Sequence, residues 1–453
     1  MSIQAHTERS HEQAHGRAQQ TARDPHWSLP KRIAFRFFFV YLGLYCLTTQ
    51  MIAGLRLPTF SKFSVPILGT LWPLRQITFW TASHLFRINR PLIYMGGAGD
   101  KTFDWVQAFC LLVLAATATV AWSSLDKREN YIFLDKWFRF FLRLVLASEM
   151  FLYGLAKIIP NQMPFPFLTR WVEPFGNFTP MGVLWNSVGA APGYEIFTGC
   201  AETLGGILLL IPRTSLLGAV ICLADLVAIF AINLAYDVSQ KLLSINLILI
   251  ALFLLAPEIP RLADFFLNRE VSRSGQPELF RSSRANWRMA ALQIVAGIYL
   301  LGSYAYGNVA GWYSYGDGRQ KSPFYGIWNV DELSIDGKLR PPLLTDHDRW
   351  RRVIFDFRDS VTFQDMDDAF AGYGASISAQ GKTIVLTKES DRNWKANFAY
   401  EQTAPSELIL DGTMDAHSIH MKLERIEANK FPLANRGFHW IADYPFDRQE
   451  VRR

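Results

Sequence analysis

Five polar side chains lie in stretches of this sequence that are otherwise apolar enough to cross a bilayer: Glu149, Tyr153, Lys157, Glu202 and Asp225. Tyr153 is four residues from both Glu149 and Lys157, a spacing that puts all three side chains on one flank of a helix. Glu149 and Glu202 each lie about 12 Å from the outer ends of their segments, and Asp225 lies near the middle of its own. We therefore expect the three acids to share one layer of a helical bundle, as a polar intramembrane site.

Such a layer of acids has more than one explanation. An ionised group at the bilayer centre costs about 2.5–3.5 kcal/mol, so these acids must face the bundle interior, pair with a cation or stay protonated. They can join helices structurally, each interhelical hydrogen bond contributing about 0.6 kcal/mol. They can instead form a site for proton movement or a polar ligand, and chance placement is the third alternative. Three acids with one cation on the same flank are unbalanced for structural bonding, which favours a site.

Helices are needed to hold these side chains at that depth. Seven segments come close to the ~20 apolar residues that cross the hydrocarbon core. They are 33–55, 103–123, 134–157, 194–212, 214–236, 241–257 and 288–306. The stretch 67–86 is interrupted by Arg75 and His84, which predicts an interfacial or re-entrant helix. The predicted fold class of this part is an α-helical membrane bundle of about seven transmembrane helices.

Several other residues in these segments have structural explanations. Gly205 and Gly206 predict close helix packing, and Asp237 with Lys241 predicts an i,i+4 ion pair at the membrane boundary. Aromatic residues in the Pro-rich stretch 160–182 predict a lid at the outer leaflet. The cysteines form no CxxC motif, which leaves small buried apolar side chains or a redox pair among the first three as alternatives. They are Cys46, Cys110, Cys200 and Cys222.

The distribution of charge orients the chain. The net charge is +6, and Arg and Lys cluster in short loops between the apolar segments. Such clusters face the cytoplasm in membrane proteins and imply no nucleic-acid partner. Seven spans then give a disordered cytoplasmic tail at 1–30, a transmembrane helical domain at 31–306 and an extracytoplasmic domain at 307–453. The first outer loop departs from this rule, because it also carries basic residues.

Residues 307–453 have a different pattern. Short β-type runs such as WRRVIFDF, KTIVLTK and SELILDG recur about every ten residues, with Gly or Asp between them. This pattern predicts an all-β antiparallel barrel of about eight strands.

Parts of the helical region resemble the DoxX-like membrane family. These parts are YGLAKIIPNQ, GCAETLGGILLLIPRT and NLAYDVSQKLLS, with GGAGDKTFDWV and WSSLDKREN in the loops. The resemblance covers about 40–257. It implies a four-helix membrane core in the bacterial cytoplasmic membrane, sometimes linked with thiosulfate or quinone redox chemistry and a partner redox subunit. No residue matches a known cofactor-binding motif, so quinone enters only as an implication of the resemblance.

The C-terminal part resembles a lipocalin-like (calycin) barrel. Such barrels often begin with Gly-x-Trp on the first strand, here Gly326, Ile327 and Trp328. A basic residue near the last strand commonly packs over the Trp, and Arg436 in NRGFHWI is the candidate.

These observations leave three functions open. Hydrolase, Walker, dinucleotide and zinc motifs are absent from the sequence, so no catalytic residue or metal site is predicted. The first function is a redox or quinone-linked membrane component. The second is a binding protein whose barrel holds a lipophilic ligand outside the cytoplasm. The third is a proton-coupled transporter, which would be expected to show an internal repeat.

The orientation gives a first testable prediction. A reporter that is active only outside the cytoplasm should be active when it is fused after Arg453, because the inner loops carry the Arg and Lys clusters. Activity of a cytoplasm-specific reporter at the same position would contradict the predicted topology.

Overall fold

A computed structural model of the chain describes residues 26–53, 66–96, 99–271, 279–280, 282–391 and 393–441. The chain divides into two compact units. The helical unit comprises Met1–Leu155 and Thr198–Tyr306, and the barrel unit comprises Ala156–Phe197 and Gly307–Arg453. Residues between the third and fourth predicted spans therefore group with the C-terminal residues.

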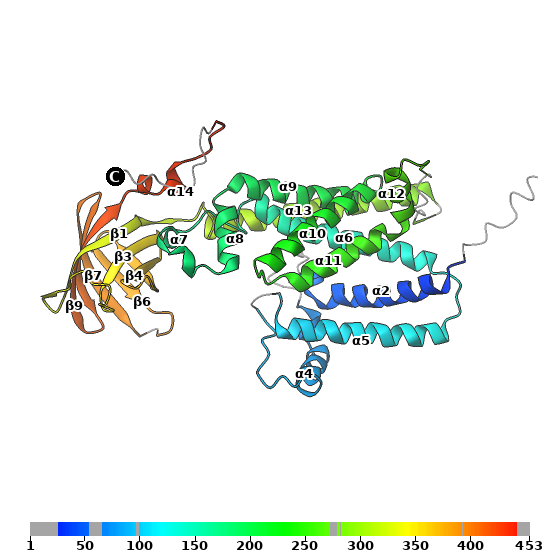
Figure 1. Cartoon of the computed structure of the whole chain (residues 1–453), viewed down its shortest axis with the longest axis horizontal. Helices are drawn as coiled ribbons and strands as arrows, with labels where there is room; N and C mark the ends of the chain where they lie inside the picture. The colour runs from blue at the N-terminus through cyan, green and yellow to red at the C-terminus, as the bar shows by residue number, and fades with distance from the viewer. Residues whose placement is uncertain are drawn as a thin grey trace, which may run out of the picture. The chain divides into compact units, whose positions relative to one another are not determined.

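Each of the seven predicted segments overlaps a long helix (Figure 1). These helices are α2 (Leu29–Thr48), α5 (Thr102–Leu125), α6 (Ile132–Ile158), α9 (Pro192–Leu210), α10 (Ser215–Ala235), α11 (Lys241–Leu255) and α13 (Ser283–Ser314). Shorter helices are α3 (Gln50–Ala53), α4 (Leu74–His84), α7 (Leu168–Val172), α8 (Pro180–Gly189), α12 (Ile259–Phe266) and α14 (Pro432–Asn435). Helix α2 packs along α5, and α10 packs along α11.

Four helical stretches within the described residues are long and apolar enough to cross a membrane. They are Thr102–Leu125, Ser215–Ala235, Lys241–Phe266 and Ser283–Ser314. Their length and composition are typical of a membrane protein. The prediction of about seven spans is matched in part, because α2, α6 and α9 are not among these stretches. Helix α4 has 11 residues, or about 16 Å, roughly half of the hydrocarbon core. It packs against α5 through Phe79 on Phe103, and Phe86, just beyond the end of α4, contacts Phe109.

A buried arginine ties the start of the chain to the loop after α5. Arg36 is 1% exposed and donates to the Tyr131 hydroxyl at 2.9 Å, the Ser123 hydroxyl at 2.7 Å and the Asp126 carbonyl at 2.9 Å. Trp27 is buried against Tyr131. The last residues of the predicted disordered tail, 26–30, are thus folded, and residues 1–25 lie outside the described part of the chain.

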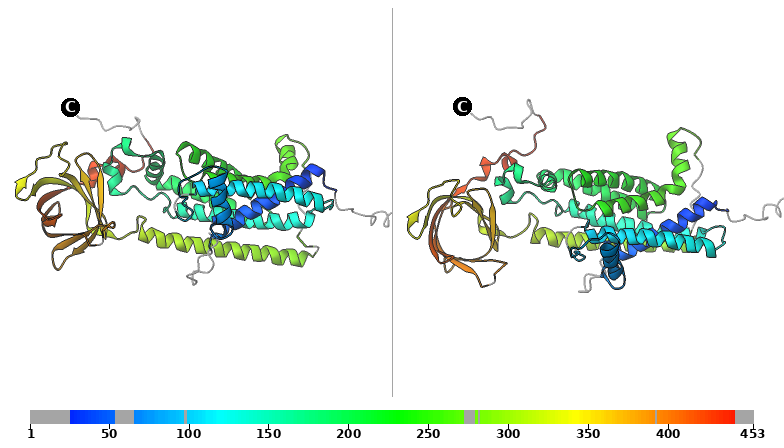
Figure 2. Two further views of the ribbon diagram at one scale, coloured as in Figure 1. Left: turned by 90° about the horizontal axis from the view of Figure 1, so that it is seen from below. Right: turned by 60° about the horizontal axis from the view of Figure 1, so that its bottom comes forward.

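The C-terminal strands form the predicted barrel (Figure 2). Eight strands pair antiparallel with their neighbours in chain order, and β1 closes the sheet by pairing with β9, Trp328 opposite Arg425. A two-residue strand, β2 (Lys338–Leu339), pairs antiparallel with the C-terminal end of β1. The barrel strands are β1 (Lys321–Ile335), β3 (Trp350–Phe357), β4 (Ser360–Asp365), β5 (Phe370–Ser378), β6 (Thr383–Thr387), β7 (Lys395–Ala404), β8 (Glu407–Met414) and β9 (His417–Ile426).

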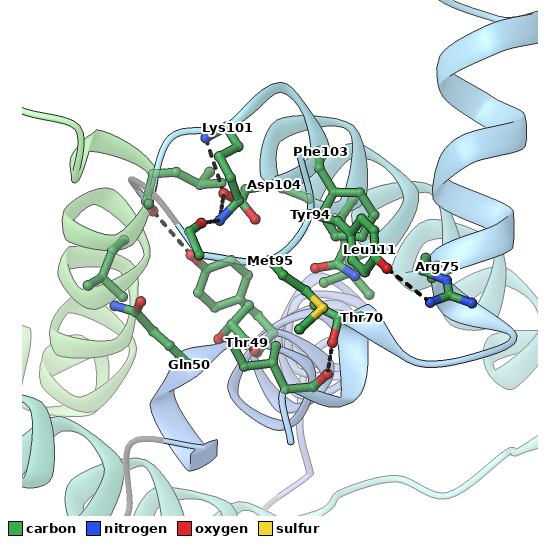
Figure 3. A pocket seen from close by; sticks show the side chains of 18 of the residues that line it. Thr49, Gln50, Thr70, Arg75, Tyr94, Met95, Lys101, Phe103, Asp104 and Leu111 are labelled. Carbon is green, nitrogen blue, oxygen red and sulfur yellow. Dashed lines mark hydrogen bonds and ion pairs between the residues drawn. The ribbon is translucent and has the colours of Figure 1, made fainter. Parts of the chain in front are cut away.

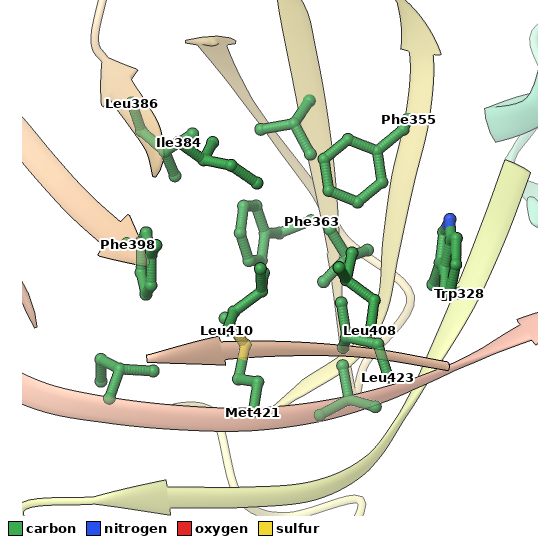
Figure 4. Close-up of a cluster of buried hydrophobic side chains, with 14 of the residues drawn as sticks. Trp328, Phe355, Phe363, Ile384, Leu386, Phe398, Leu408, Leu410, Met421 and Leu423 are labelled. Carbon is green, nitrogen blue, oxygen red and sulfur yellow. The ribbon is translucent and has the colours of Figure 1, made fainter. Parts of the chain in front are cut away.

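The barrel interior is filled by apolar side chains (Figure 4). Trp328 is 1% exposed and packs in one cluster with Phe355, Phe363 and Phe398, which come from three other strands. Its indole N–H donates to the Phe324 carbonyl at 2.9 Å, so the polar atom of the ring is satisfied inside the core. These residues therefore form a packed core inside the barrel.

The basic residue beside the Gly-x-Trp sequence is Arg425 of β9. Gly326 has φ of 150°, and a Cβ there would lie 2.7 Å from Arg425 Nε, so glycine admits the arginine side chain. Arg436, the residue that the sequence suggested for this place, follows α14 and lies beyond the last strand.

The segment 163–172 packs on the outer surface of the barrel. Leu168 is buried against Ile327 and Ile354, whose side chains point out of the barrel, and Trp171 stacks edge-on with Phe431. Asp356 accepts a hydrogen bond from the Leu168 backbone N–H at 2.9 Å and pairs with Arg319. Part of the stretch 160–182, for which the sequence predicts a lid at the outer leaflet, thus covers an apolar face of the sheet.

Trp328→Ala should lower the free energy of unfolding of the barrel by about 3–5 kcal/mol, because it empties a large buried volume. Hydrogen–deuterium exchange of the barrel strands in the full-length protein measures the change. Trp440→Ala is the matched control, since Trp440 is 88% exposed. Equal exchange in both variants would contradict a core role for Trp328.

Candidate functional site

Glycines allow helices α6, α9 and α10 to pack closely. A Cβ on Gly154 of α6 would lie 2.4 Å from Thr203 Oγ1 of α9, and one on Gly206 would lie 2.7 Å from the Phe151 ring. On the other side of α9, a Cβ on Gly205 would lie 2.8 Å from Cys222 Sγ of α10. Larger side chains at these positions would push the helices apart, so the glycines set the spacing of the three helices.

This packing brings together three of the predicted site residues in the helical unit. Glu149 is 2% exposed and Glu202 is 3% exposed. Tyr153 lies close enough to both for their charges to act on it. The Gln50 side-chain amide donates to the Tyr153 hydroxyl at 3.1 Å. Glu149 Oε2 is buried and makes no hydrogen bond with any described residue, so this oxygen is available to a proton or a small ligand.

Asp225, the third acid of the predicted layer, lies near Cys222 in the helical unit. It lies on α10 one turn beyond Cys222, and Cys222 is within electrostatic range of both Asp225 and Glu202. The acids of α9 and α10 are therefore neighbours of one thiol. Of the four cysteines, all are free; Cys46 and Cys222 are buried, Cys110 is partly buried and Cys200 is exposed.

Lys157, the cation of the predicted site, belongs to the barrel unit. It is 8% exposed, and its charge acts on Glu195, which is fully buried at the start of α9. The Glu195 carboxylate also accepts a hydrogen bond from the Met163 N–H at 2.9 Å. The sequence did not single out Glu195, because this residue lies at the start of its apolar segment and not near the centre. A carboxylate at the end of such a segment is not unusual.

Two loops of the helical unit are joined by Asp100. Its carboxylate accepts hydrogen bonds from the backbone N–H groups of Lys241, at 2.8 Å, and Leu242, at 2.9 Å, and so caps the start of α11. The Lys241 ammonium lies 2.8 Å from Asp237 and 3.7 Å from Asp100. The predicted Asp237–Lys241 pair is thus part of a three-residue contact that fixes both loops.

Beside these loops lies a pocket of about 560 Å³ (Figure 3), a volume typical of small-molecule sites. Side chains and backbone from α2, α3, α4, α5 and α11 line it with the loops. Its polar lining includes Gln50, Arg75, Lys101, Asp104 and Gln240. Gln50 therefore faces this pocket and also donates to Tyr153.

Sequence reasoning did not find this pocket, because Gln50 and Gln107 appear as isolated polar residues within apolar segments. Only the interruption of 67–86 by Arg75 was a signal. The described residues contain no group of three His, Cys, Asp or Glu side chains that could hold a metal ion.

Gly206→Val should destabilise the helical unit by about 1–3 kcal/mol, since the added methyl groups overlap the Phe151 ring. Thermal unfolding of the purified protein in mild detergent measures the change. Gly193→Val in the same helix is the control, because no atom lies within 4 Å of a Cβ there. An equal loss of stability in both variants would refute a packing role for Gly206.

Comparison with known proteins gives one informative relationship. No family model and no solved structure match the chain. Over 115 residues the sequence is 41% identical to the uncharacterized protein YwoB of Bacillus subtilis (strain 168), and the match covers 25% of this chain and 71% of YwoB. At this identity, and over this share of the relative, the chain belongs to the family of YwoB.

Proposed function

We propose that this protein is a quinone-linked redox component of the bacterial cytoplasmic membrane, with a proton-handling site at Glu149, Tyr153 and Glu202. In this proposal all seven long helices cross the bilayer, the N-terminus is cytoplasmic and the barrel is extracytoplasmic. The observation that carries it is the buried Glu149 carboxyl, which lies beside Tyr153 and has one oxygen without a hydrogen bond among the described residues.

The residues of the site fit a quinone through hydrogen-bond donation and proton transfer. A bound quinone supplies two-electron, two-proton chemistry. The Gln50 amide and the Tyr153 hydroxyl can donate hydrogen bonds to carbonyl oxygens, and Glu149 can hold or release a proton beside them. The electrons would come from a partner redox subunit, as the DoxX-like resemblance implies.

The two alternative functions have less support. A barrel that holds a lipophilic ligand needs interior space, whereas buried side chains such as Trp328, Phe363 and Phe398 occupy the barrel interior. A transporter of the common inverted-repeat type would have an internal repeat, and the sequence shows no clear one. Burying acids inside the membrane is costly, so these acids are the strongest indication of a functional site.

Glu149→Gln tests the proposal. It preserves the shape and hydrogen bonding of the side chain but removes the titration, so it should abolish complementation of a deletion strain while expression stays near normal. Glu129→Gln, in an exposed loop, should complement fully. Glu149→Leu distinguishes the functional role from a purely structural one. If Glu149 is purely structural, Glu149→Gln should complement and Glu149→Leu should lower expression of the protein.

The quinone part needs a separate measurement. Protein purified in mild detergent should carry a quinone that mass spectrometry identifies in an organic extract.

Full complementation by Glu149→Gln would refute the proton-handling site. Wild-type protein that carries no quinone would refute the quinone link.

A further inference from the structure

The pocket beside the loops of the helical unit has a net positive lining. Three charged residues line it: Arg75, Lys101 and Asp104. Lys101 and Asp104 neutralise one another, with Lys101 Nζ 3.2 Å from the Asp104 carboxylate. Arg75 has no ion pair with any described residue. Its neighbour is Tyr94, whose hydroxyl is 3.5 Å from Arg75 Nη1 and whose ring centre is 5.3 Å from the guanidinium.

Two lining residues also carry buried polar atoms that make no hydrogen bond with the described part of the chain. These atoms are Arg75 Nε, a donor, and Gln240 Oε1, an acceptor. The Gln107 amide, in contrast, is occupied by the Gly69 carbonyl at 2.8 Å. Buried polar groups are normally satisfied by a partner, so the pocket calls for a ligand that offers both an anionic oxygen and a donor.

The rest of the lining is apolar. Ile67, Leu71, Met95, Leu111 and Leu243 contribute to it, and Leu71 and Met95 are exposed. Helix α5, which lines one wall, is one of the helices able to cross a membrane. An amphiphile could therefore place its charged head in the pocket and its chains along the apolar surface.

We infer that this pocket binds the head group of an anionic, hydroxyl-bearing phospholipid, a phosphoglycerol group, with Arg75 on the phosphate and Gln240 accepting from a hydroxyl. A guanidinium suits a phosphodiester because its fork of N–H donors matches two phosphate oxygens. The inference does not depend on the proton-handling site. Glycerol phosphate free in solution offers the same head chemistry, and only the apolar wall favours the lipid.

Native mass spectrometry of the full-length protein in a neutral detergent tests the inference. Dioleoylphosphatidylglycerol should bind more tightly than dioleoylphosphatidylcholine, which has no hydroxyl donor and no net charge. Arg75→Gln should weaken phosphatidylglycerol binding about ten- to hundredfold, because it removes a charged hydrogen-bond donor. Gln240→Leu should weaken phosphatidylglycerol binding but leave phosphatidylcholine binding unchanged.

Arg90→Gln is the matched control. Arg90 lies in the same loop region, is exposed and bonds to Thr102 at 3.1 Å, but it does not line the pocket. Equal affinity of wild type and Arg75→Gln for phosphatidylglycerol would overturn the inference, as would an equal loss with Arg90→Gln. Competition by glycerol 3-phosphate at concentrations similar to the lipid would overturn the lipid assignment, because the chains would then contribute nothing.

Discussion

The close approach of α6, α9 and α10 is the constraint on which the helical unit depends. Glycines at 154, 205 and 206 remove the side chains that would separate the helices, so backbone and polar groups of adjacent helices come within contact. A polar group that is buried between helices is shielded from solvent, so its partners come from inside the bundle. Close packing therefore both creates the interior and concentrates Glu149 and Glu202 within it.

The elements were predictable because their patterns are strong and local. Apolar length located the long helices of the described residues, and alternation with turn residues located the barrel, including the buried Trp328. The partners within the site were not predictable in the same way. Lys157 shares a helix flank with Glu149, yet its charge acts on Glu195. The spacing of residues shows which side chains share one face of a single helix. Their partners depend on how the neighbouring helices are rotated, and local sequence does not show that rotation.

The segment 163–172 shows a second limit of local patterns. Its aromatic residues suit a membrane interface, and they suit an apolar protein surface equally well. Strand β1 carries Ile327 and β3 carries Ile354 on the outer face of the barrel, and these side chains would otherwise meet water. Covering them with Leu168 removes that apolar area from solvent. The buried Asp356–Arg319 pair and the Leu168 N–H then fix the segment in register.

Gln50 connects the acid site with the pocket. Its amide donates to the Tyr153 hydroxyl, and the same residue lines the pocket that contains Arg75. The amide has a second N–H donor, so only a ligand that turns the Gln50 side chain away from Tyr153 would break this bond. The Tyr153 hydroxyl would then lose a hydrogen-bond donor within electrostatic range of Glu149 and Glu202. By linkage, any change at the acids that strengthens the Gln50–Tyr153 bond must weaken binding of such a ligand by the same factor.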